Sequence, residues 1–398
     1  DGILDGTSFG ASCVQPDVPE ASLYHDPLPN MSEDCLTLNI WSYSDNSKAP
    51  VIVWIHGGSL RIGGSSQAMY GGREFADRGV VFVSLNYRLG VLGWLAHPEL
   101  SAESPGRGSG NYGLLDQIAA LKWVQSNIAA FGGDPANVTI MGESAGALSA
   151  TYLLTSPETQ GLFQKAIIQS TNNRNFPVLD EASYGLPSAE KYGERLFEAL
   201  QIEDIQTARS LDAREITSRA GRIGFAAQGT IDGKTLPMQL VEAFDRGEIS
   251  KVPVLAGFNS GEVRAQRILL PRGAKTPEAY EDAIVERYGD LSGEILAQYP
   301  SNDVEVAKLA TVRDAIYGWA TERIVRKVTQ VGQPAFMYVF DYCYPAAEQA
   351  DLCAFHAGEL PFVFGSLDAE HLPINWPVPD GEADRDLSNV LLDYWTTF

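Results

Sequence analysis

The sequence lacks any run of 18 apolar residues, so it contains no segment long enough to cross a membrane as an apolar helix. Basic residues are also scarce. There are 29 lysines and arginines against 51 aspartates and glutamates, which gives a formal net charge of -22. A surface of this charge repels phosphate groups, which argues against nucleic acid and anionic membrane surfaces as partners.

Cysteine is rare too, with Cys13, Cys35, Cys343 and Cys353 as the complete set. None lies in a CxxC pair and no nearby histidine spacing suggests zinc, so we expect neither a metal nor a cofactor. The four fall into two sequence-local pairs, which suits two disulfides and a secreted or periplasmic protein. Four reduced cysteines in a cytosolic enzyme are the alternative.

What the sequence does contain is a regular alternation of apolar runs and amphipathic segments. Predicted strands are Leu36–Trp41, Val51–His56, Val80–Tyr87, Val138–Met141, Ala166–Gln169, Val252–Phe258 and Phe336–Phe340. Predicted helices are Leu114–Ile128, Ala145–Leu154 and Ala307–Val328. Near-continuous Val/Ile/Leu strands separated by helices predict a mostly parallel central sheet with helices on both faces.

Residues 172–250 break this rhythm, because they are polar, punctuated by Gly and Arg, and mostly helical by pattern. We expect a helical insertion beside the sheet within one catalytic domain, 1–398. The stretch Asn259–Arg272 is a second candidate lid segment.

One strand leads directly into a G-x-S-x-G motif, Gly142-Glu-Ser144-Ala-Gly146, and then into a helix. In this context the serine lies on a strained turn that raises its oxygen above the sheet edge. Side chains at the two glycine positions would collide with the adjoining strand and helix. Ser144 is therefore the predicted nucleophile; the alternative is a glycine-rich turn with a buried serine.

A second buried strand ends in His56-Gly57-Gly58-Ser59. Glycines let backbone N–H groups approach a substrate carbonyl, and the N–H of Ala145 lies at the start of the helix after Ser144. We predict an oxyanion hole built from Gly58, Ser59 and Ala145, and we interpret His56 as structural.

Several segments, in order, resemble the type-B carboxylesterase family, which includes cholinesterases and bacterial p-nitrobenzyl esterases. They are Ser32–Asn39, Asn86–Gly90, Asn111–Gln117, Phe131–Pro135, Asn137–Thr139, Gly142–Gly146, Gly257–Glu262 and Phe355–Gly365. The resemblance runs along nearly the whole chain and implies an α/β-hydrolase fold. It also implies that the family extends beyond both Asp1 and Phe398, so that this chain looks trimmed at both ends.

The resemblance implies a Ser-Glu-His triad with Glu262 as the acid and His356 as the base. Gly261 stands where the family usually has Asp, so Glu359, one helical turn after His356, is the competing acid and is expected to be structural. The remaining histidines, His25, His97 and His371, lie in loop contexts and are expected at the surface.

The resemblance also pairs Cys13 with Cys35, and it gives Cys343 and Cys353 no family-wide counterpart. Ser59 replaces the third glycine of the family's oxyanion motif. Cholinesterases carry a tryptophan for choline in the Cys13–Cys35 loop. Residues 15–34 contain none, so choline esters are not expected.

These features predict a carboxylic ester hydrolase whose partner is a small-molecule ester; the oligomeric state is not fixed. Alternatives are an amide or thioester hydrolase and a non-catalytic adhesion or scaffold relative. Arg61 and Arg264 flank the predicted site segments and suggest an ester that carries an extra carboxylate; two solvated arginines are the alternative.

Overall fold

The computed structural model describes residues 6–398 except 29, 44–46, 105, 107 and 272. Its centre is a sheet of seven strands in the order β3-β5-β4-β6-β7-β8-β9. The strands are β3 (Leu38–Trp41), β4 (Ala49–Ile55), β5 (Val81–Leu85), β6 (Gly133–Glu143), β7 (Lys165–Gln169), β8 (Val254–Asn259) and β9 (Ala335–Phe340). Only β3 pairs antiparallel with its neighbour.

All seven strands coincide with predicted ones, although their bounds shift. β3 begins two residues later than expected because Leu36, which is 53% exposed, lies outside the sheet. β6 begins five residues earlier, at Gly133, which pairs with Ala49.

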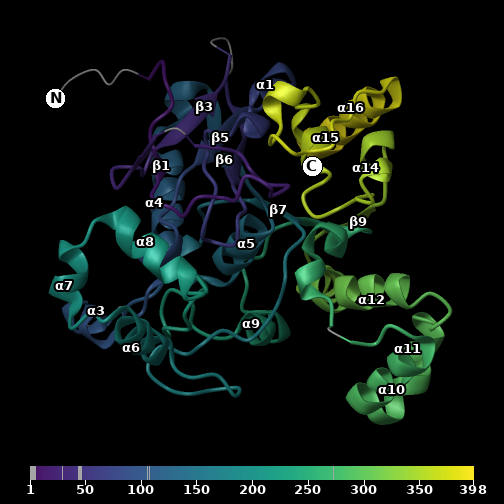
Figure 1. The fold of residues 1–398 in the computed structure, drawn as a ribbon. Coiled ribbons are helices and arrows are strands. Elements are labelled where there is room, and N and C mark those ends of the chain that lie inside the picture. Colours follow the sequence, from purple (N-terminus) through teal and green to yellow (C-terminus); the bar gives the residue numbers. More distant parts are fainter. Residues whose placement is uncertain (1–5, 29, 44–46, 105, 107, 272) are drawn as a thin grey trace.

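Both faces of the sheet are covered, because successive strand residues point to opposite sides. Val51, Val53 and Ile55 join the cluster formed with α4 (Tyr112–Asn127), α5 (Ala145–Thr155), α9 (Leu240–Arg246) and α13 (Trp319–Gln330). Ile52 and Trp54 join the opposite cluster with α1 (Arg73–Asp77), α15 (Leu360–Phe364) and α16 (Glu382–Thr397). Figure 1 shows α15 and α16 together at the yellow end of the chain. The α/β-hydrolase architecture is thereby confirmed.

The predicted insertion contains α6 (Ala189–Leu200), α7 (Ile205–Ser210), α8 (Ala213–Arg222) and α9. The first three pack with α2 (Gly90–Trp94) into a separate apolar cluster, beside which lies α3 (Pro98–Glu103). By contrast, α9 covers the sheet itself. The remaining helices follow β8: α10 (Pro277–Tyr288), α11 (Ser292–Gln298), α12 (Val304–Arg313) and α14 (Pro345–Gln349).

The helix predicted at Ala307–Val328 is interrupted. Helix α12 leads into a π-helical turn at Asp314–Gly318, and α13 follows. The wider turn inserts extra backbone and changes the direction of the residues after it, a feature often found at functional sites. Tyr317 lies on this turn and is buried.

Both predicted disulfides are present, Cys13–Cys35 and Cys343–Cys353. The first ties together a two-stranded parallel pair, β1 (Ser12–Cys13) with β2 (Met31–Ser32). Among the described residues, no helix combines the length and the apolar character that a membrane span requires.

One expectation about the histidines is wrong. His97 is only 6% exposed. It forms the N-cap of α3, and its ring stacks on Phe197 of α6 with 4.4 Å between the ring centroids. Its polar loop context concealed a contact with a helix a hundred residues away.

Candidate active site

Ser144 occupies a sharp turn between the last residue of β6 and the first residue of α5. Its backbone has φ 55° and ψ −118°, a strained combination for a residue with a side chain. The turn is held by its own N–H, which donates to the carbonyl of Gln169 at 2.9 Å.

The flanking glycines are required by space. A Cβ on Gly142 would lie 2.4 Å from the carbonyl carbon of Gly146, and one on Gly146 would lie 1.9 Å from the carbonyl oxygen of Ile55. Both neighbours are backbone atoms, which cannot move aside cheaply. The motif therefore allows helix α5 to lie directly against the end of β4.

The residues predicted as a triad lie in one hydrogen-bonded row. His356 Nε2 is 2.7 Å from Ser144 Oγ, and His356 Nδ1 is 2.5 Å from Glu262 Oε2. Glu262 is fully buried and His356 is 4% exposed. With the proton on Nδ1, that N–H donates to Glu262 and Nε2 is free to accept from the Ser144 hydroxyl.

The two candidate acids are clearly distinguished by their contacts. Glu262 accepts from the Asn259 backbone N–H at 2.8 Å and from the histidine. Glu359 instead accepts from the side chains of Gln169 and Asn259, at 2.9 and 2.5 Å. Glu359 thus tethers the ends of β7 and β8 and leaves His356 to Glu262.

Gly261, where the resemblance places an aspartate, lies against the segment that leads to His356. A Cβ at this position would be 1.9 Å from the carbonyl oxygen of Cys353, and the Gly261 N–H donates to the Ala354 carbonyl at 3.0 Å. The loop closed by the Cys343–Cys353 disulfide is therefore packed directly on the loop that carries Glu262.

Two further residues hold the histidine, and no motif pointed to either. The Tyr24 hydroxyl donates to the His356 carbonyl at 3.0 Å, from within the Cys13–Cys35 loop. The Tyr317 ring lies 5.3 Å from the imidazole, centroid to centroid, and its hydroxyl donates to Gln266 at 2.8 Å. The sequence reads as one continuous helix through Tyr317, and Tyr24 lies in no recognised motif, so neither residue carried a signal in the sequence.

Three buried carboxyl groups set the electrostatics. Burial raises the pKa of Glu143 to about 8, and burial also raises the pKa of Glu359. Burial alone would lower the pKa of His356, but the nearby carboxylates of Glu143 and Glu262 outweigh it and raise that pKa to about 9. Glu143 Oε1 is 3.3 Å from His356 Nε2, on the same nitrogen that faces Ser144. The site favours positive charge on the imidazole.

The predicted oxyanion segment curls beside Ser144. Gly58 has φ 99° and Ser59 has φ 58°. Within the described chain, no acceptor is recorded for the N–H groups of Gly58, Ser59 or Ala145. His56 holds this segment through two contacts. Its Nδ1–H donates to the Gly57 carbonyl at 2.9 Å, and its ring stacks on Tyr87. Burial lowers the pKa of His56 to about 4, so this ring stays neutral.

A cavity of about 160 Å³ opens over these groups. Its wall includes Ser144, His356 and the Gly57–Ser59 turn, together with Asp26 and Gln266. No lysine or arginine is found among the described residues that line it. Arg61 is exposed and does not line the cavity, and Arg264 pairs with Asp351 on the surface. The hypothesis that these two arginines bind an anionic substrate is therefore not supported, and the alternative of two solvated arginines fits better.

A serine, an imidazole and a buried carboxylate in this hydrogen-bonded order, above the carboxyl ends of a parallel sheet, form the arrangement that is typical of serine hydrolases with the α/β-hydrolase fold. The comparisons identify the family. The sequence model of the carboxylesterase family matches residues 1–398. The chain belongs to the carboxylesterase family, and it is an enzyme that hydrolyses carboxylic esters.

Two curated relatives show which esterases this chain resembles. The chain is 36% identical to a fumonisin B1 esterase of Sphingopyxis macrogoltabida, covering 100% of this chain and 73% of the relative. It is 35% identical to a para-nitrobenzyl esterase of Bacillus subtilis (strain 168), of which it covers 80%.

Solved structures agree. A p-nitrobenzyl esterase superposes with a TM-score of 0.80 at 32% identity, over 98% of this chain and 79% of that one. A carboxylesterase of Geobacillus stearothermophilus gives a TM-score of 0.79 at 34% identity, again over 98% and 79%.

Proposed function

We propose that Ser144, His356 and Glu262 are the nucleophile, base and acid of this esterase, and that the N–H groups of Gly58, Ser59 and Ala145 form the oxyanion hole. The proposal rests on the pair of distances that His356 makes, 2.7 Å to Ser144 and 2.5 Å to Glu262. Both lie within the range that proton transfer requires.

The reaction follows from these positions. Nε2 of His356 takes the hydroxyl proton as Ser144 Oγ attacks the ester carbon, and the three N–H groups bind the developing oxyanion. His356 then returns the proton to the departing alcohol, which leaves an acyl group on Ser144. Water, deprotonated by the same nitrogen, attacks the acyl group; Nε2 then passes this proton to Ser144 Oγ as the acid leaves, which restores the free serine. Glu262 holds the Nδ1–H throughout.

Covalent labelling tests the nucleophile. A fluorophosphonate should add one label per chain, and the labelled peptide should contain Ser144. Ser144→Ala should abolish labelling and lower kcat by about a millionfold with an unchanged melting temperature. Ser126→Ala, on the exposed face of α4, serves as the matched control. A label on another serine would refute the assignment.

We further propose that the substrate is an uncharged or cationic ester rather than one with a free carboxylate. Asp26 and Glu143 are the acidic residues of the cavity wall, and no lysine or arginine among the described residues lines it. Glu143 faces His356, which leaves Asp26 as the carboxylate without a cationic neighbour in the wall. Asp26 is fixed at the wall because Gln67 Nε2 donates to its Oδ2 at 2.8 Å. An anionic substrate would approach this carboxylate without compensation.

Two esters of one leaving group decide the question: p-nitrophenyl butyrate and p-nitrophenyl hemisuccinate. We expect kcat/KM to be lower for the anionic ester by about tenfold, and Asp26→Asn to narrow that gap. Equal values in the wild-type enzyme, or a gap unchanged by Asp26→Asn, would contradict the proposal.

Two disulfides also support secretion or a periplasmic location, which fractionation of the native host would test.

We also propose that the chain forms one catalytic domain, 1–398, in which 172–250 is an insertion. Limited proteolysis that released a stably folded fragment would argue against a single domain.

A further inference from the structure

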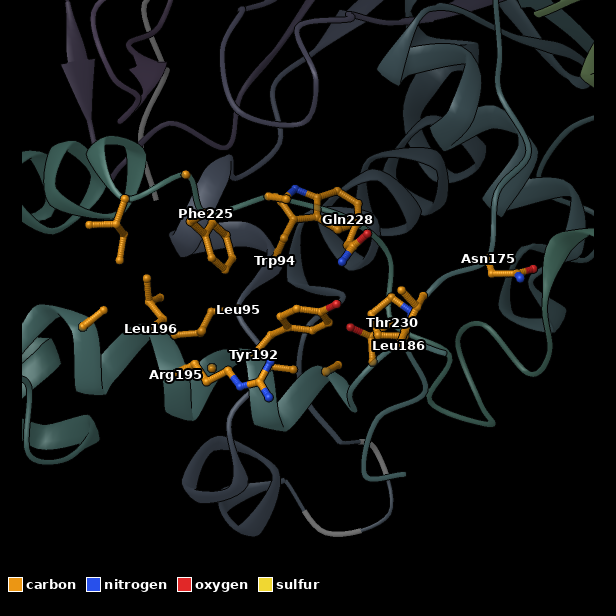
Figure 2. Close-up of a pocket in the computed structure, with 18 of the residues that line it drawn as sticks. Trp94, Leu95, Asn175, Leu186, Tyr192, Arg195, Leu196, Phe225, Gln228 and Thr230 are labelled. Atoms are coloured by element: carbon orange, nitrogen blue, oxygen red, sulfur yellow. The ribbon is translucent and has the colours of Figure 1, made fainter. Parts of the chain in front are cut away.

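A second and larger cavity, of about 510 Å³, lies away from Ser144. It is formed where α6 faces α2 and the segment that follows α8, and none of its lining residues lines the cavity at Ser144. Figure 2 shows Tyr192 on α6 turned toward Trp94 and Gln228 across the opening, with Leu95, Leu196 and Phe225 gathered at one end. The volume lies in the range of small-molecule sites.

The charge of this cavity is opposite to that of the protein. Its charged lining residues are Arg174 and Arg195, and no described aspartate or glutamate lines it. Neither arginine forms an ion pair with a residue that the structure describes. Arg174 lies over the Phe176 ring, 5.6 Å from its centroid. In a chain of net charge -22, two unpaired arginines on one apolar cavity form a local anion-attracting site.

The walls are held in place before any ligand binds. The Gly229 N–H donates to the Tyr152 hydroxyl of α5 at 3.1 Å. The adjacent Thr230 forms two hydrogen bonds with Asn111. The Thr230 N–H donates to Asn111 Oδ1 at 2.9 Å, and Asn111 Nδ2–H donates to the Thr230 carbonyl at 2.7 Å. On the opposite side, a Cβ on Gly193 would lie 1.9 Å from the Ala96 carbonyl oxygen, so α6 is packed directly on the chain after α2. Because the cavity is already formed, little free energy is lost on binding to order the side chains and loops around the ligand.

We propose that this cavity is a second ligand site that binds an amphiphilic carboxylate, with its alkyl chain against Leu95, Leu196 and Phe225 and its carboxylate at Arg195, while Arg174 adds positive charge to the same wall. Guanidinium groups bind carboxylates through paired hydrogen bonds, and the apolar end buries the chain. The acids released by ester hydrolysis belong to the same chemical class, but the proposal stands on the cavity alone.

Calorimetric titration with decanoate tests the site in an enzyme whose catalytic cavity is blocked by a fluorophosphonate, or, if no label attaches, in Ser144→Ala. We expect one molecule of decanoate to bind per chain. Arg195→Gln and Arg174→Gln should each weaken binding about threefold to tenfold. Arg222→Gln, an exposed arginine of α8 outside the cavity, should leave it unchanged.

Decan-1-ol separates charge from apolar burial, because it has the same chain without the carboxylate. Its weaker affinity should not respond to either arginine substitution. The proposal is overturned if decanoate does not bind the blocked enzyme below millimolar concentration, or if both arginine variants bind it as the Arg222→Gln control does.

Discussion

The proposed nucleophile and the proposed base reach the same hydrogen bond by different means. Ser144 is placed by backbone alone: its turn joins β6 to α5, and Gly142 and Gly146 let these elements meet without a Cβ between them. His356 lies in a loop, and its position depends on four residues from three separate segments: Tyr24, the pair Gly261 and Glu262, and Tyr317.

This difference has consequences for how each side can fail. Replacing Gly142 or Gly146, the glycines of the turn (the nucleophile elbow) that carries Ser144, would put a Cβ into backbone atoms, so the fold and the position of Ser144 would be lost together. The contacts around His356 are separable. Removing one contact should shift the position or the pKa of the His356 imidazole while the buried sheet remains intact. The effect should therefore show in kcat more than in stability.

Among the changes around His356, the largest expected effect comes from Glu262→Gln. The amide cannot stabilise the imidazolium and favours the wrong tautomer of His356, so kcat should fall by about ten-thousandfold. Steady-state hydrolysis of a p-nitrophenyl ester measures it, with circular dichroism to verify folding.

Glu359→Gln is the matched control, because it removes a buried carboxylate that bonds Asn259 and Gln169 rather than the histidine. It should cost far less activity. If Glu359→Gln abolished turnover while Glu262→Gln kept it, Glu359 would be the acid and the site would need to be reassigned.

The same contrast explains what sequence could predict. The elbow could be predicted because a strand, five residues and a helix form one local pattern whose glycines have a steric reason. The seven strands and both cysteine pairs followed equally from local runs and spacing. Glu262 was implied only by resemblance, since no local pattern distinguishes it from Glu359.

Contacts across long separations could not be predicted. Tyr24 and His356 are 332 residues apart, and His97 meets Phe197 across a hundred residues. Arg264 looked suited to the pocket by its place next to Glu262, but Asp351, on the disulfide-closed loop, pairs with it at the surface. Such pairings depend on tertiary packing, which hydrophobic periodicity does not encode.

The next largest expected effect comes from removing the Cys343–Cys353 disulfide. This disulfide closes a loop that packs on Gly261 and ends at Cys353, three residues before His356. The chain-entropy estimate for a loop of this length is about 3 kcal/mol. In Cys343→Ser/Cys353→Ser we expect kcat to fall by roughly tenfold to a hundredfold, because a looser loop lets the imidazole drift from Ser144.

Assays run well below the melting temperature of the variant separate the two effects, since all molecules are then folded. A loss of kcat that disappeared under these conditions would mean that the disulfide only stabilises the fold. Mass spectrometry of the non-reduced wild-type digest comes first: if all four cysteines alkylate without reductant, the disulfide argument fails.

A smaller effect is expected from Tyr24→Phe, which removes one hydroxyl that donates to the His356 carbonyl at 3.0 Å. A single such bond contributes about 1 kcal/mol, so kcat should fall about fivefold with little change in KM. Tyr43→Phe, an exposed tyrosine hydroxyl bonded to Asp77, is the matched control. Equal activity in both variants would show that the loop is held without Tyr24.

The smallest expected effect is a shift in pH dependence. In the proposed mechanism His356 acts as a base only when neutral, and the carboxylates around it raise its pKa above the ordinary value. The rising limb of kcat/KM should therefore lie above about pH 6.5. Glu143→Gln removes the carboxylate 3.3 Å from Nε2, so the pKa of His356 should fall and the limb should move to lower pH. The shift should be small, because burial raises the pKa of Glu143 to about 8, so that this carboxyl group is mostly protonated and uncharged near neutrality. Glu348→Gln, an exposed acid of α14, should leave the limb in place. A shift to higher pH in Glu143→Gln would mean that Glu143 does not raise the pKa of the histidine, and that Glu262 alone sets the protonation state of the base.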